Sequence, residues 1–78
     1  MKILFLGRLA DAAGERERMI EPPPGLTDVD ALRAWLGKDM SALLDPSVRM
    51  IVNDVLAHSG QAITATDEVA FFPPVSGG

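Results

Sequence analysis

The sequence predicts an α+β fold in which one main helix packs across a mixed sheet of four to five strands. Its 78 residues are enough for one small hydrophobic core and too few for two. Apolar residues make up 47% of the chain and charged residues 23%, as in an ordinary folded globule. Short apolar runs typical of strands lie on both sides of a single segment with helical periodicity.

The N-terminal part is predicted to form a hairpin. Residues 2–8 are nearly continuous in hydrophobicity and are bounded by Gly7, as expected of a strand covered on both faces. Residues 10–14 are mostly small and predict a turn, and residues 17–21 predict a weaker strand that returns antiparallel. The run Pro22–Pro24 lacks backbone donors and therefore interrupts the sheet.

A helix is predicted after the prolines, with Thr27 as its N-cap and Gly37 just past its end. Asp28 and Asp30 fall in its first turn, where the helix dipole favours anions, and Asp30 stands where a capping box would have glutamate. Apolar residues at helical spacing form a stripe wide enough to cover one face of a sheet: Val29, Leu32, Trp35 and Leu36.

The second half is predicted to supply the remaining strands. Residues 48–53 alternate in hydrophobicity, and residues 69–72 form a last apolar strand. Asn53 and Asp54 tolerate left-handed backbone, so they suit a tight reversal into a short strand at residues 55–56.

The order of these elements predicts how the strands pair. A right-handed crossover places the last strand beside the first and parallel to it. This arrangement is a β-grasp, or ubiquitin-like, fold. We expect it to be one domain over residues 1–72, followed by a tail at residues 73–78 that is extended and flexible.

Composition and charge exclude several classes of function. The absence of cysteine excludes disulfides, thiolate metal sites and cysteine nucleophiles. The net charge of −4 argues against nucleic acid and anionic membrane surfaces as partners. No apolar run reaches the roughly 18 residues of a membrane helix, and no secretion signal is recognisable, so a cytoplasmic location is expected.

The side chains predict neither a catalytic constellation nor a metal site. His58 is the only histidine, and a lone loop histidine is most often a solvated surface group. Trp35 lies on the helix stripe and is expected to pack in the core. Gly7 and Gly14 lack the lysine and serine or threonine of a phosphate-binding loop. No bound cofactor or metal is expected, and any ATP would be bound by another protein.

The strongest signal is the C-terminal segment, Phe72-Pro73-Pro74-Val75-Ser76-Gly77-Gly78. Pro73 and Pro74 end the last strand and favour an extended exit. Gly77 and Gly78 carry no side chains, so this backbone can enter a narrow channel in another protein. The alternative is a frayed end of small residues, which is common at domain termini. The Pro-Pro-Val-Ser approach favours the first interpretation.

A carboxylate at Gly78 needs activation before it can accept sulfur. At neutral pH the group is ionised and is a poor electrophile. Joining it to AMP makes the carbonyl reactive, and a sulfur donor can then displace AMP to leave a thiocarboxylate. Such a chain is a carrier, and its catalysts are other proteins.

Residues 67–78 resemble, position by position, the C-terminal signature of a known family, the small sulfur-carrying subunits of molybdopterin synthase. The opening Lys2–Phe5 and the pair Val52-Asn53 followed by Ala57 support the resemblance. It implies that an E1-like activating enzyme adenylates the chain with ATP and that a sulfurtransferase supplies sulfur. It further implies delivery of the sulfur to a cyclic pyranopterin in the large synthase subunit, within a heterotetramer of two small and two large subunits.

The expected site residues fall into two groups. Gly78 carries the reacting group, and Val75, Ser76 and Gly77 thread the partner's channel. A partner-binding patch is expected from residues near the ends of the first and last strands: Leu6, Arg8, Phe72, Pro73 and Pro74.

The chain departs from the family pattern at several positions outside the tail. Ala10 and Asp11 stand where the family often has an Arg-Glu pair, and Arg8 is expected to substitute for that arginine. Asp54 and Thr66 stand where the family often has glycine. Thiazole-synthesis sulfur carriers and ubiquitin-like protein modifiers also end in Gly-Gly, so they remain alternatives. An interaction module with an inert tail is a third.

Overall fold

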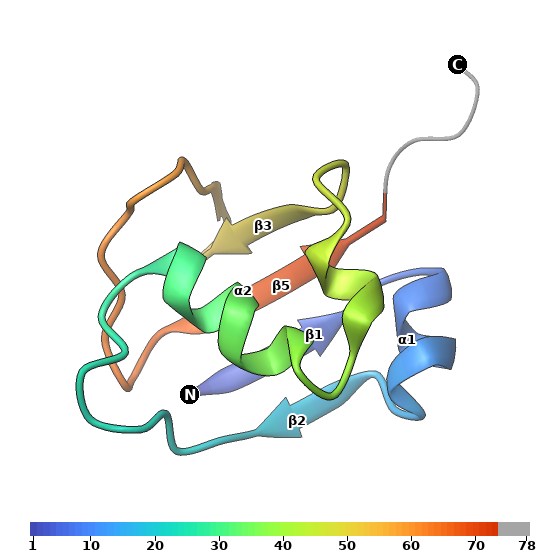
Figure 1. Cartoon of the computed structure of the whole chain (residues 1–78), viewed down its shortest axis with the longest axis horizontal. Helices are drawn as coiled ribbons and strands as arrows, with labels where there is room; N and C mark the ends of the chain where they lie inside the picture. Colours follow the sequence, from blue (N-terminus) through green and yellow to red (C-terminus); the bar gives the residue numbers. More distant parts are fainter. Residues whose placement is uncertain (74–78) are drawn as a thin grey trace.

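In the computed structural model, which describes residues 1–73, helices cover one face of a five-stranded mixed sheet (Figure 1). The strands are β1 (Lys2–Phe5), β2 (Glu17–Met19), β3 (Arg49–Val52), β4 (Val55–Leu56) and β5 (Glu68–Phe72). The helices are α1 (Arg8–Ala13), α2 (Val29–Gly37) and the 3₁₀ helix η1 (Ser41–Leu44). No helix among these residues is long and apolar enough to cross a membrane.

The strand order is β2-β1-β5-β3-β4, which makes β5 the central strand. It pairs parallel with β1 and antiparallel with β3. β2 returns antiparallel to β1, although it ends at Met19 rather than Glu21. The predicted α+β class, the β-grasp order and the pairing of the last strand with the first are confirmed.

β5 supplies the centre of the core. Val69 and Phe71 are fully buried, whereas Ala70 and Phe72 face the opposite side of the sheet. Phe71 pairs in register with Phe5, and their rings stack with centroids 6.3 Å apart. The last strand is therefore hydrogen-bonded along both edges, and the side chains on one of its faces pack in the core.

α1 is the main element that the sequence analysis missed. The first strand ends at Phe5 rather than Arg8, and residues 10–14, predicted as a turn, lie mostly in this helix. Alanine-rich sequence favours a helix, and the buried side chain of Leu9 holds this short one against the core. Gly14 ends the helix in the left-handed conformation, and its N–H donates to the Ala10 carbonyl at 2.9 Å.

The N-cap of α2 is Asp28, so the prediction of Thr27 was wrong by one residue. The Asp28 carboxylate accepts a hydrogen bond from the Ala31 N–H at 2.8 Å. The Thr27 carbonyl instead accepts the Ile63 N–H at 2.9 Å. Asp30 does not cap the helix but accepts the Gly60 N–H at 2.6 Å.

Two further predictions concern the end of α2 and the turn after β3. Gly37 lies inside α2 rather than just past its end. Asn53 and Asp54 have φ angles of 49° and 69°, which confirms the left-handed reversal into β4.

Replacing Phe71 with alanine is expected to lower the free energy of unfolding by about 3–5 kcal/mol, because it leaves a cavity against Phe5. The matched control is Phe72→Ala on the same strand. Removal of this half-buried side chain should lower the free energy of unfolding by about 1 kcal/mol. Urea unfolding followed by circular dichroism measures both values. Equal losses would contradict the assigned faces of β5.

Candidate functional site

The expected site straddles the limit of the described residues. Pro74, Val75, Ser76, Gly77 and Gly78 lie outside them. The structure does place the other four members of the expected site near the end of β5: Leu6, Arg8, Phe72 and Pro73. The base from which the tail departs can therefore be described.

Leu6 and Phe72 are brought together by the register of β1 and β5. Phe5 pairs with Phe71, and the Leu6 N–H donates to the Phe71 carbonyl at 2.9 Å, so the ladder continues one residue further. Leu6 is 40% exposed and Phe72 is half-buried. Both side chains lie on the sheet face opposite α2, by the alternation of their strands.

More apolar residues extend this surface across the sheet. Ala70 stands between Leu4 of β1 and Ile51 of β3, and Ile51 pairs in turn with Leu56 of β4. We call this surface the outer patch, and it consists of Leu4, Leu6, Ile51, Leu56, Ala70 and Phe72. Contiguous apolar residues on an uncovered sheet face are typical of protein-binding surfaces.

The opposite end of the same face is charged. Lys2 Nζ lies 3.1 Å from Glu17 Oε1 and 3.6 Å from Glu68 Oε1. The hydrogen bond to Glu17 is the main cause that raises the pKa of Lys2 above its ordinary value. Such exposed pairs contribute little to stability. The outer face thus carries a cluster of ion pairs where β5 begins and apolar side chains where β5 ends, beside exposed Arg49, which pairs with Phe72.

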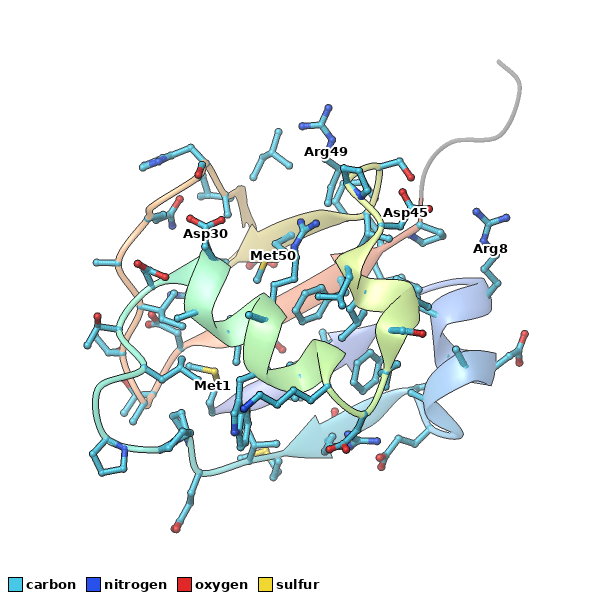
Figure 2. The ribbon with its side chains drawn as sticks, viewed as in Figure 1. Met1, Arg8, Asp30, Asp45, Arg49 and Met50 are labelled. Carbon is cyan, nitrogen blue, oxygen red and sulfur yellow. The ribbon has the colours of Figure 1, made fainter. Side chains whose placement is uncertain are left out.

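A cleft of about 360 Å³ opens beside Pro73, between α1 and η1. Arg8 and Asp45 stand on its two sides, at the end of the molecule where the described chain stops (Figure 2). Asp45 Oδ1 accepts the Ser47 hydroxyl at 2.6 Å and the Ser47 N–H at 2.9 Å. These bonds lower the pKa of Asp45, and the charge of Arg8 adds a smaller effect in the same direction.

Neither His58 nor Trp35, which the sequence analysis also considered, lines the cleft beside Pro73. His58 is exposed, and its Nδ1 lies 3.0 Å from the Ser59 carbonyl oxygen. Trp35 packs against the core, as predicted. Within residues 1–73, no three histidine, aspartate or glutamate side chains lie close enough to hold a metal ion.

Sequence reasoning left four members of the outer patch out of the expected site, Ala70 among them, and it missed one contact of the tail. Leu4, Ile51 and Leu56 join Phe72 only through pairing between strands that are distant in sequence. Gly7 was considered as a strand boundary and as a candidate phosphate-binding glycine, yet it lies against Pro73. The alternation of residues 48–53 was the available signal for Ile51; nothing local signalled the contact of Gly7.

Comparison with known proteins confirms the resemblance drawn from the C-terminal segment. A family model described as the ThiS family matches residues 3–78. The molybdopterin synthase sulfur carrier subunit of Escherichia coli (strain K12) is 33% identical over 82 residues, covering 100% of this chain and 99% of that protein. Small archaeal modifier protein 1 of Haloferax volcanii is 36% identical over 80 residues, covering 90% of this chain and 91% of that protein.

Solved structures agree with the fold. A chain from Pyrococcus furiosus, provisionally named molybdopterin converting factor, subunit 1, has a TM-score of 0.79 and is 25% identical. The match covers 95% of each chain.

Ser47→Ala is expected to raise the pKa of Asp45 toward its ordinary value of 3.8, because the Ser47 hydroxyl is the largest cause of the lowering. Arg8→Gln should raise it by a smaller amount. Folding lowers this pKa, so the ionised carboxylate stabilises the fold at pH values above its ordinary pKa. This contribution is lost as the pH falls through the lowered pKa. Titration of the Asp45 carboxyl carbon by NMR measures the shifts. A larger shift in Arg8→Gln than in Ser47→Ala would contradict this assignment.

Proposed function

Because the chain belongs to the ThiS family, we propose that it is a cytoplasmic sulfur carrier for molybdopterin synthesis. The observation that carries the proposal is the segment Pro73-Pro74-Val75-Ser76-Gly77-Gly78, which follows directly on the central strand. Full-length similarity to a sulfur carrier subunit of molybdopterin synthase supports it. In this proposal the chain binds no cofactor or metal itself.

The proposed chemistry takes place at the Gly78 carboxylate. A carboxylate oxygen attacks the α-phosphorus of ATP on an E1-like activating enzyme, and pyrophosphate leaves. Hydrosulfide, or its equivalent delivered by a sulfurtransferase, then attacks the carbonyl carbon. A C–S bond forms as the C–O bond to AMP breaks, AMP leaves with the electron pair, and the hydrosulfide proton passes to water. The product is a thiocarboxylate, and with hydrosulfide no oxidant or reductant is needed.

The partner proposed to consume this sulfur is the large subunit of molybdopterin synthase. The loaded tail would enter its active site through Val75, Ser76 and Gly77, whose small or short side chains suit a narrow channel. There the thiocarboxylate would give its sulfur to a cyclic pyranopterin. Two small and two large subunits would form the working heterotetramer.

The outer patch is the proposed docking surface for these partners. It lies at the end of β5, so a protein bound there would also meet the tail. Its apolar side chains would supply the buried centre of an interface, and the charged end around Lys2 would supply a polar rim. Arg8 and Pro73 would extend the contact toward α1.

Deleting Gly77 and Gly78 is expected to abolish sulfur transfer while the melting temperature hardly changes. The reacting group is removed, whereas the core formed by residues 1–72 is kept. Transfer is measured with the activating enzyme, ATP, a sulfide source and the large subunit, and melting by circular dichroism. Transfer that survives the deletion would refute the carrier proposal. Loss of both transfer and stability would refute the separation of tail and core.

Leu6→Ser is expected to weaken binding to the large subunit by about tenfold, because it removes an apolar side chain from the outer patch. Val55→Ser is the matched control. Val55 is 64% exposed but pairs with Val52, so it lies on the other face of the sheet. Isothermal titration calorimetry measures both affinities. Equal weakening by the two changes would exclude the outer patch as the docking surface.

A second candidate function is a ubiquitin-like protein modifier. The similarity to small archaeal modifier protein 1 favours it, since that relative is 36% identical. The two functions share the activated Gly78 but differ in what it reacts with. Tryptic peptides in which a target lysine carries an isopeptide-linked remnant of this tail would establish modification. Co-purification with a large synthase subunit would favour the sulfur carrier, and co-purification with a thiazole-forming enzyme would favour the thiazole pathway.

A further inference from the structure

We propose that Gly7 is a positioning residue for the tail: because it has no side chain, Pro73 rests against it, and this contact sets the direction in which the chain continues beyond Pro73. The inference rests on the proposed function, since that direction matters only if Gly78 must reach a site in another protein.

The contact between Gly7 and Pro73 is too close to accept a methyl group unless Pro73 gives way by a few tenths of an ångström. An ideal Cβ at Gly7 would stand 3.1 Å from Pro73 Cγ and 3.5 Å from Pro73 Cδ. The shorter distance is tighter than ordinary van der Waals contact between carbon atoms. Any side chain at residue 7 would therefore push the proline ring away.

The backbone of Gly7 cannot turn aside easily. Its φ of 54° and ψ of −136° lie where residues with a side chain are rarely found. The preceding Leu6 N–H is bonded to the Phe71 carbonyl at 2.9 Å, and the Gly7 carbonyl accepts the Ala10 N–H at 3.1 Å. Hydrogen bonds on both sides thus fix the residue between β5 and α1.

The space around Pro73 determines where a displaced ring can go. On one side the ring meets Gly7, and on another it borders the cleft of about 360 Å³ next to η1. A side chain at residue 7 would thus displace Pro73 from Gly7. Five residues follow Pro73 and can span up to roughly 17 Å. A small tilt at their base would move Gly78 by ångströms, and misplacement on that scale slows reactions strongly.

The direction of the tail can be measured without any assay of activity. Because the chain has no cysteine, Ser76→Cys provides a single attachment site for a nitroxide spin label. Paramagnetic broadening of amide signals then reports which residues the label approaches. In Gly7→Ala the set of most strongly broadened amides should differ from that of the chain that keeps Gly7.

Gly14→Ala is the matched control. Gly14 also has a positive φ, 78°, and flanks the same helix, but nothing lies within 4 Å of the position of its Cβ. Its replacement strains the backbone without touching Pro73. The broadening pattern of Gly14→Ala should therefore match that of the labelled chain that keeps both glycines.

The kinetics of unlabelled chains should also distinguish Gly7→Ala from Gly14→Ala. If only about a tenth of the Gly7→Ala chains hold the tail in the productive direction, the KM of the synthase reaction for this chain should rise about tenfold. The kcat should hold, because a tail that has entered the active site reacts normally. Gly14→Ala should leave both constants unchanged. In a Pro73→Ala background, adding Gly7→Ala should raise KM by less than about twofold, because the ring that it displaces is gone.

The outcomes separate this inference from the proposed function. An unchanged broadening pattern in Gly7→Ala, or a shifted pattern with unchanged KM, overturns the positioning role. If the native sequence carries no sulfur, the proposed function fails, while the broadening still decides the direction of the tail. If Gly7→Ala does not fold, Pro73→Ala with Gly7 intact replaces it. That variant should spread the broadening over more residues, and an unchanged pattern again overturns the inference.

Discussion

The structure depends on the pairing of the last strand at the centre of the sheet. β5 is hydrogen-bonded to β1 on one edge and to β3 on the other, and Phe71 is buried against the ring of Phe5. A chain without disulfides needs such a core. This same strand leads into Pro73, so the most firmly held element of the fold is also the base of the tail.

The alternation of β5 divides the molecule into two surfaces with different uses. Val69 and Phe71 face the helices and supply stability, whereas Ala70, which is 7% exposed, and half-buried Phe72 lie on the opposite face in the outer patch. One strand can therefore build the core, display an apolar surface and present a terminal group. Under the proposed function this arrangement lets a partner recognise the folded body and the reacting end at once.

Much of the fold follows from local patterns, because each pattern has a direct physical cause. The proline run separates the hairpin from α2, the alternation of residues 48–53 gives β3, and Asn53-Asp54 gives the reversal into β4. α1 could not be predicted, because a six-residue helix is marginal by itself and depends on the contact of Leu9 with the core. The position of the α2 N-cap at Asp28 likewise depends on a distant bond, from the Ile63 N–H to the Thr27 carbonyl.

The candidate site was only partly predictable, for a similar reason. The pairing of the last strand with the first was enough to place Leu6 near Phe72. Predicting that Ile51 and Leu56 belong to the outer patch would have required the register of β3 against β5 and of β4 against β3. The contact of Gly7 with Pro73 required the backbone angles of a turn between β1 and α1, which composition does not reveal.

The most direct test is the mass of the C-terminal peptide after incubation with an activating enzyme, ATP and a sulfide source. Replacing oxygen with sulfur adds nearly the mass of one methionine oxidation, and the chain has four methionines. Cleavage after Glu68 solves this problem, because residues 69–78 contain none. The account predicts an ATP-dependent gain of one sulfur-for-oxygen exchange in that peptide. An unchanged peptide, with any gain confined to methionine-containing fragments, would contradict it.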